Sequence, residues 1–239
     1  MKLQTFLAHA GITSRRKAED LIRDGRVKVN GHVAEIGERV DEAKDEVLFD
    51  EKRVTAAETK MTYLIYKPVG VLSTTDDELG RKNVVDFLRS NLPAKTVLPR
   101  LYPVGRLDKD SEGLMLLTND GELTQKMTHP SYEVEKTYRV TVTGHPTEKA
   151  LAHLERGVRL EEGTTAPAKV EVIDESPDET KLEITIHEGR YHQVKRMLRR
   201  VGYEVVQLVR IKMGEYTLEN LDGAKYTLLS AADSLAKNK

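Results

Sequence analysis

One apolar run constrains the fold of this chain more than any other feature. Residues Leu114 to Leu117 are followed by Thr118, and turns enclose them: the acidic, glycine-flanked segment 105–113 before them and Asn119-Asp120-Gly121 after them. Five apolar or β-compatible residues between two turn signals predict a buried strand. A carboxylate on a loop that runs straight into the core has little freedom to move, and a catalytic carboxylate needs that restriction. We therefore expect a functional carboxylate in this turn, the alternative being an acidic surface turn.

The composition favours a soluble, cytoplasmic protein. Of 239 residues, 38% are apolar, which is enough for the core of one large domain or two smaller ones. Cysteine is absent, so disulfides and cysteine-ligated zinc are excluded, and the cytoplasm is the simplest compartment. The N-terminus lacks the apolar region of a signal peptide, and no run approaches the roughly 18 residues of a membrane span. We expect no membrane partner.

The net charge of −1 hides two basic regions. Residues 2–30 carry seven Lys or Arg and three carboxylates, a net of +4, and residues 187–212 carry seven and two, a net of +5. The rest of the chain must then carry −10. Two basic regions on an acidic background indicate a polyanionic partner.

The first 50 to 60 residues have the pattern of a small basic domain. A helix begins at Leu3 and stops at Gly11, and Thr13 or Ser14 caps a second helix whose outer face is basic. The alternating segment 26–33, interrupted by Asn30-Gly31, predicts a hairpin. The polar segment 50–60 predicts a linker, and we place the domain boundary so that the domains are residues 1–58 and 59–239.

The second domain has more strands than crossover helices, which favours an α+β fold with a mixed, largely antiparallel sheet. Strands are predicted at 63–72, where Pro68 and Gly70 interrupt the strand near a turn, and at 136–142, 168–173, 181–187 and 205–213. Helices are predicted after Asn83 and at 122–128, 146–156 and 193–201, and the last residues are predicted to be a polar tail.

Several kinds of chemistry do not fit the sequence. His187 and His192 are one residue too far apart for a zinc-peptidase helix, so no metal site is expected. No glycine-rich phosphate loop and no Gly-x-Ser-x-Gly elbow is present. Asp108 and Glu112 could form the carboxylate pair of a glycosidase, although both lie on one short loop.

Segments 14–22 and 25–31 resemble the S4 RNA-binding domain. By that resemblance the N-terminal RNA contacts would come from six residues: Ser14, Arg15, Arg16, Lys17, Arg26 and Lys28. The segments 102–108, 111–121, 129–130, 135–138 and 188–197 resemble, in order, the RsuA/RluB family of ribosomal RNA pseudouridine synthases. The fold implied is a small S4-like domain followed by the catalytic domain of that family.

The second resemblance also implies the roles of site residues. Asp108 is expected to be the essential aspartate that attacks or deprotonates the ribose–uracil unit, Tyr138 to contact the target base, and Arg106 to hold the opened RNA. Lys195 takes the basic position that pairs with the aspartate, and we expect it to keep Asp108 charged when a bound base excludes water. Arg196 beside it is expected to meet RNA phosphate.

The implied activity is isomerisation of a specific uridine in ribosomal RNA, by a monomer that needs no cofactor. The large-subunit 23S type is favoured over the small-subunit 16S type, although segment 188–195 resembles the latter and the target uridine stays open. The other hypothesis is a non-catalytic RNA-binding or ribosome-assembly protein on the same fold.

Overall fold

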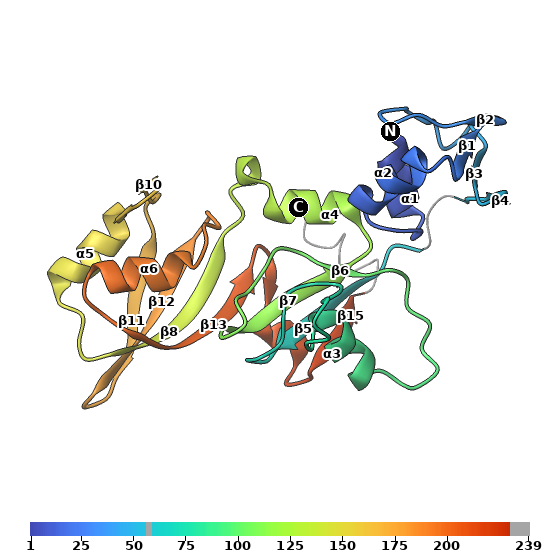
Figure 1. The fold of residues 1–239 in the computed structure, drawn as a ribbon. Coiled ribbons are helices and arrows are strands. Elements are labelled where there is room, and N and C mark those ends of the chain that lie inside the picture. The colour runs from blue at the N-terminus through green and yellow to red at the C-terminus, as the bar shows by residue number, and fades with distance from the viewer. Residues whose placement is uncertain (56–58, 230–239) are drawn as a thin grey trace. The chain divides into compact units, whose positions relative to one another are not determined.

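The computed structural model describes residues 1–55 and 59–229, and the chain divides into two compact units (Figure 1). The first contains Met1–Met61 with the short segments Val97–Arg100 and Asn119–Gly121, and the second contains the rest. The predicted boundary at residue 58 and the last part of the predicted tail, residues 230–239, lie outside the described residues. None of the helices in the described ranges has the length and apolar character needed to span a bilayer.

The first unit packs two helices against a small sheet with strand order β2-β1-β3-β4. Its elements are α1 (Leu3–His9), α2 (Arg15–Arg23), β1 (Val27–Val29), β2 (His32–Val33), β3 (Val47–Phe49) and β4 (Lys52–Arg53). The Ser14 hydroxyl accepts a hydrogen bond from the Lys17 amide, as a helix cap does. Ala18 and Ile22 face the core, so the basic residues of α2 face solvent.

The Asn-Gly hairpin of the first unit is confirmed. Asn30 and Gly31 both have positive φ, 47° and 85°, which the tight turns of two-residue hairpins require. Val29 pairs with His32 across the turn, and the Asn30 side-chain Nδ2 donates to Asp45 at 2.9 Å.

The second unit is built on a nine-stranded sheet whose main path is β11-β12-β8-β13-β7-β5-β15. Its strands are β5 (Thr62–Lys67), β6 (Tyr102–Pro103), β7 (Glu112–Thr118), β8 (Lys136–Thr143), β9 (Arg159–Leu160), β10 (Gly163–Thr164), β11 (Lys169–Glu175), β12 (Glu179–Ile186), β13 (Val205–Met213), β14 (Tyr216–Thr217) and β15 (Tyr226–Leu229). Its helices are α3 (Val84–Asn91), α4 (Gly121–Thr128), α5 (Glu148–Arg156) and α6 (Gln193–Arg200), with short 3-10 turns η1 (Pro130–Tyr132) and η2 (Leu218–Leu221). Strands β9 and β10 form a separate hairpin.

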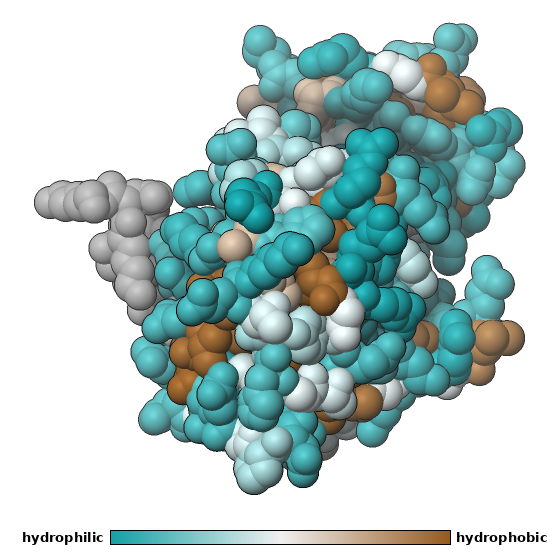
Figure 2. Space-filling view, turned by 90° about the vertical axis from the view of Figure 1, so that its left-hand side faces the viewer, coloured by the Kyte–Doolittle hydropathy of each residue, from teal (hydrophilic) through white to brown (hydrophobic). Residues whose placement is uncertain are grey.

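The sheet is mixed, as expected. Its neighbours pair antiparallel except β13 and β7, which run parallel at its centre. Residues Leu114 to Leu117 of β7 are fully buried, which confirms the strand predicted from the apolar run. In Figure 1, α5 and α6 lie across the β11, β12 and β8 part of the sheet. Figure 2 views this end of the molecule, where the surface is mainly hydrophilic and apolar residues form small separate patches.

Some predicted boundaries were wrong. No strand was predicted after Met213, but Tyr226–Leu229 forms β15 and pairs with β5. The interruption predicted at Pro68 and Gly70 is confirmed, because β5 ends at Lys67 and Gly70 has a φ of 89°. Helix α5 begins at Glu148 because the Thr147 hydroxyl caps it.

Candidate active site

The acidic loop before β7 is held at three points by one segment, residues 67–73. The Lys67 ammonium donates to the Ser111 carbonyl at 2.6 Å, and the Gly70 amide donates to the Lys109 carbonyl at 2.7 Å. The Ser73 hydroxyl donates to the Leu107 carbonyl at 2.6 Å and accepts from the Leu107 amide at 3.0 Å. These bonds fix the backbone on both sides of Asp108.

Lys67 is a buried charge beneath this loop. Its side chain is 0% exposed, and burial lowers the pKa of its amine to about 8, while the carboxylates of Asp108, Asp110 and Glu112 oppose the shift. The sequence predicts Lys67 only as part of a strand, and the one local signal for a special role is its position directly before Pro68. Its function is to hold the loop that carries Asp108.

Asp108 lines a cavity of about 290 Å³ in the second unit. Side chains and backbone from the acidic loop, from β8 and β13, and from the start of α6 surround it, including Arg106, Ser111, Tyr138, Tyr191, His192 and Arg210. The Asp108 carboxylate is 29% exposed, and one of its oxygens lies 3.2 Å from His192 Nε2. The predicted carboxylate therefore faces a space that a ligand can enter.

Lys195 lies between two carboxylates. Its Nζ is 2.5 Å from Asp110 Oδ1 and 3.8 Å from Asp108 Oδ2. The hydrogen bond from Lys195 lowers the pKa of Asp110. The expected partner Asp108 is within ion-pair distance, but the short contact is with Asp110, which was not predicted as a site residue.

Tyr138 and Arg106, which are predicted to contact the base and the RNA, both line the cavity. Tyr138 is on β8, directly across from Arg210 of β13, and both are buried. The Arg210 Nε donates to the Leu114 carbonyl at 2.8 Å, so it ties β13 to β7. Lys136 also lines the cavity, and burial together with the charge of Arg210 lowers the pKa of its amine.

The motif from Glu188 to Gln193 shapes the other wall. Arg190 donates to the Gly163 and Thr164 carbonyls of β10 and to Glu188, whose other oxygen accepts from Gln193 at 2.9 Å. These bonds tie the start of α6 to the β9–β10 hairpin. His192 precedes α6 in a left-handed conformation with a φ of 46°, and this turn brings its ring to Asp108.

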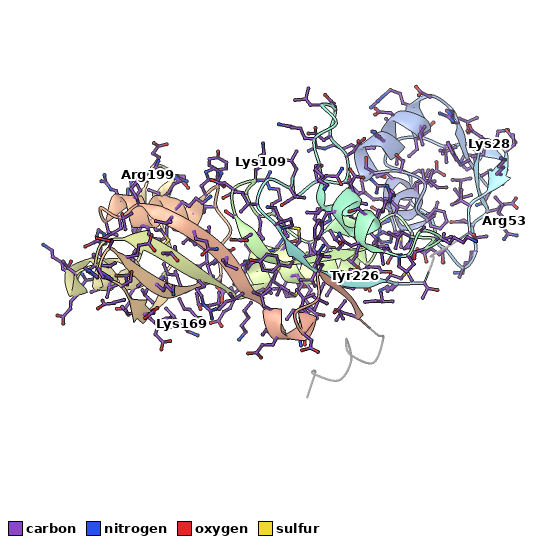
Figure 3. All side chains as sticks on the ribbon, turned by 90° about the horizontal axis from the view of Figure 1, so that it is seen from below. Lys28, Arg53, Lys109, Lys169, Arg199 and Tyr226 are labelled. Atoms are coloured by element: carbon purple, nitrogen blue, oxygen red, sulfur yellow. The ribbon has the colours of Figure 1, made fainter. Side chains whose placement is uncertain are left out.

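The residues predicted to bind RNA differ in their present partners. Arg15, Arg16 and Lys17 are exposed on α2 and form no ion pair within the described residues. Arg26 pairs with Asp50, Lys28 with Glu51 and Arg196 with Glu162, at 2.5 to 2.6 Å. In the second unit, Lys109 and Arg199 project from the same side, and Lys169 from the opposite side (Figure 3).

The glycosidase alternative does not fit the geometry. The two oxygens of Glu112 accept hydrogen bonds from Tyr66 at 2.9 Å and from Gln207 at 2.7 Å. Glu112 is not among the residues that line the cavity with Asp108. The two carboxylates therefore do not flank a common substrate site, as that reaction requires.

Known proteins resemble both units. A family model of the S4 domain matches residues 1–47, so the first unit is an S4 RNA-binding domain. A family model described as RNA pseudouridylate synthase matches residues 61–200. The ribosomal large subunit pseudouridine synthase B of Bacillus subtilis is 48% identical over 225 residues, 93% of this chain and 88% of that protein. An uncharacterised RNA pseudouridine synthase of Aquifex aeolicus is 38% identical over 234 residues, 98% of this chain and 92% of its own.

A crystal structure of a pseudouridylate synthase superposes with a TM-score of 0.65 at 34% identity, covering 98% of this chain and 97% of that one. The chain belongs to the RNA pseudouridylate synthase family. It is an isomerase that converts uridine in RNA to pseudouridine, as the motifs predicted.

Proposed function

We propose that this chain isomerises a specific uridine of large-subunit ribosomal RNA, with Asp108 as the catalytic residue. The observation that carries the proposal is the placement of the Asp108 carboxylate in a cavity with Tyr138, beside His192 and Lys195. The name of the 48% identical Bacillus relative supports the large subunit over the small one. The non-catalytic alternative has no support from these comparisons.

The chemistry follows from what the cavity residues can do. A uridine must leave its stack before its sugar can be reached, and an aromatic ring offsets part of that cost, a role we assign to Tyr138. Asp108 then attacks or deprotonates the ribose–uracil unit while the bond between uracil N1 and ribose C1′ breaks. The uracil rotates and C5 bonds to C1′; C5 loses its proton and N1 gains one, so no atom is added or lost.

The cations near Asp108 would stabilise its charge once a bound base excludes water. An anion in a dry site is costly unless an opposite charge lies close to it. Lys195 is 83% buried, lies 3.8 Å from Asp108 and can supply that charge.

We further propose that the enzyme acts in the cytoplasm as a monomer without a cofactor, and that the domains are residues 1–58 and 59–239.

The test is to incubate the purified protein with 23S and 16S ribosomal RNA transcripts and to map pseudouridine at nucleotide resolution. We expect one modified uridine in the 23S transcript. Modification of 16S RNA alone would contradict the subunit assignment.

The matched variant is Asp108→Asn, which keeps the shape of the side chain and removes its charge. We expect no detectable product and an affinity for RNA within about twofold of the original, because the phosphate contacts that dominate affinity are unchanged. Product formation by Asp108→Asn would contradict the role of Asp108.

A further inference from the structure

Tyr191 is a large aromatic side chain that the chain leaves in solvent. It is 68% exposed, although burial of an aromatic ring is normally favourable. It lines the same cavity as Asp108. Tyr191 has no role in the chemistry described above.

The ring of Tyr191 is stacked on that of His192. The ring centroids are 3.8 Å apart and the planes differ by 17°. His192 in turn contacts Asp108 through its Nε2 at 3.2 Å, so the stacked pair lies beside the expected catalytic carboxylate. The other face of Tyr191 has no ring partner in the described part of the chain.

The backbone beneath the stack is tied down. The Tyr191 carbonyl accepts from Arg196 at 3.1 Å, and the Arg190 amide donates to the Gln193 side chain at 3.0 Å. An aromatic ring held in place pays little conformational entropy when a second ring stacks on it. The stack is thus preorganised for a flat partner.

The cavity and the exposed ring differ in what they can accept. At about 290 Å³ the cavity is close to the small end of ligand pockets, roughly 300 to 1,000 Å³, and can enclose little more than one nucleotide. The nucleotides on either side of an extruded uridine must remain outside, where their bases have lost one stacking neighbour. Aromatic rings bind such bases without regard to sequence, since every base has a flat face.

We propose that Tyr191, backed by His192, is a stacking platform for the nucleobase next to the target uridine. This proposal rests on the proposed function, because it requires an extruded uridine in the cavity. The platform would fix the direction in which the RNA strand leaves the cavity, and it adds a binding subsite to the residues that contact the target base.

The test uses an RNA hairpin that contains the mapped uridine, and two copies in which the base on its 5′ or 3′ side is replaced by an abasic site. The Kd of each RNA and its single-turnover rate are measured for the original protein, Tyr191→Leu, Tyr191→Phe and Tyr132→Leu. Tyr132 is an exposed tyrosine of η1 that is not among the cavity-lining residues and serves as the matched control.

We expect the original protein to bind one abasic RNA about tenfold more weakly than the intact hairpin, the size that loss of one base–aromatic stack gives. Tyr191→Leu should bind the intact hairpin about tenfold more weakly than the original protein does. It should no longer distinguish the intact hairpin from that abasic RNA. Tyr191→Phe and Tyr132→Leu should both keep the difference. A thermal midpoint for Tyr191→Leu equal to that of the original protein would show that the change is not one of folding.

Two results would overturn the platform. One is that the original protein binds the intact and both abasic hairpins equally; the other is that Tyr191→Leu keeps the original discrimination. Neither touches the proposed function, which fails instead if the original protein forms no pseudouridine in 23S RNA.

Discussion

At the scale of single residues, the position of the Asp108 carboxylate depends on the groups that hold the backbone of Leu107. The Ser73 hydroxyl both donates to and accepts from that backbone. Because Leu107 precedes Asp108, loss of this clamp frees the carboxylate and leaves two half-buried backbone groups without their partner.

We expect Ser73→Ala to lower the free energy of unfolding by about 1 to 3 kcal/mol and to reduce kcat, because each unsatisfied polar group is costly. Denaturant unfolding and single-turnover rates measure the two effects. The matched control is Ser90→Ala, whose hydroxyl donates to a carbonyl on the exposed side of α3 and should change neither by much. Equal effects of the two substitutions would contradict the clamp.

Lys67 provides a prediction about pH. The pKa of its amine is about 8 in the folded protein, compared with the usual lysine value of 10.5 in the unfolded chain. Between these two values the unfolded chain still binds a proton that the folded chain has released. The free energy of unfolding therefore rises with pH across this window. Below pH 8 both states are protonated, and the cost of the buried charge is present in full.

Relative to Lys67→Met, which cannot titrate, the original protein should gain about 2 kcal/mol of stability between pH 7 and pH 9.5. Urea unfolding at the two pH values measures this difference, and other titrating groups cancel in the comparison. A difference that does not change with pH would show that the Lys67 amine is not shifted.

Asp108, Tyr138 and Lys195 were predicted as site residues because they lie in long motifs. The structure places Asp108 and Tyr138 in one cavity and Lys195 3.8 Å from Asp108, and their roles stay predictions. The sequence did not allow Ser73 or Lys67 to be assigned, because their contacts with the acidic loop span 34 and 44 residues of chain and leave no local pattern. His192 lies within a motif, but its left-handed backbone turns its ring towards Asp108, and no periodic pattern in the sequence predicts that conformation.

At the scale of secondary structure, one glycine decides whether the site can form. Gly113 is on β7 with a φ of 109°, and a Cβ added there would lie 2.3 Å from the Arg210 carbonyl oxygen and 2.6 Å from the Arg210 nitrogen. Both neighbours are backbone of β13, which pairs with β7 in parallel, so neither can move aside cheaply. The close approach of the two strands requires glycine here.

We expect Gly113→Ala to destabilise the protein by more than about 3 kcal/mol, since steric overlap adds to backbone strain. Gly144→Ala is the control: that glycine has a φ of 70° but nothing within 4 Å of the added Cβ, so it isolates the strain, about 1 to 2 kcal/mol. The unfolding free energies of the two variants measure the difference. Similar losses would contradict the steric explanation.

Secondary structure followed the sequence wherever a segment carried its own signal. The apolar run of β7 and the Asn83 cap of α3 were local and gave correct elements. The strand β15 was missed because it is four residues long, and its pairing partner β5 lies about 160 residues earlier in the chain. Short edge strands of this kind depend on the partner rather than on their own pattern.

At the scale of the whole molecule, the cations proposed to bind RNA and the carboxylate proposed to be catalytic belong to different units. The exposed cations Arg15, Arg16 and Lys17 of α2 lie in the unit that matches the S4 domain, whereas Asp108 is in the other. Cations that bind phosphate release counterions, so affinity falls with salt, with a slope of about 0.7 to 0.9 per phosphate contact. Arg26 and Lys28 are already paired with Asp50 and Glu51, and they must break these pairs before they bind phosphate.

The salt slope of RNA binding should therefore fall by about 2 in a triple variant with Gln in place of Arg15, Arg16 and Lys17. It should fall by less than about 1 in a double variant with Gln in place of Arg26 and Lys28. Kd for the 23S fragment, measured from 50 to 300 mM salt, gives both slopes. The triple variant should lose kcat/KM in proportion to its affinity while its single-turnover rate at saturating RNA stays within about twofold, because the removed groups do not contact the reacting atoms. A fall in that saturated rate would contradict the expectation that these cations act only in binding. Equal salt slopes for the triple variant and the original protein would show that α2 does not contact the RNA.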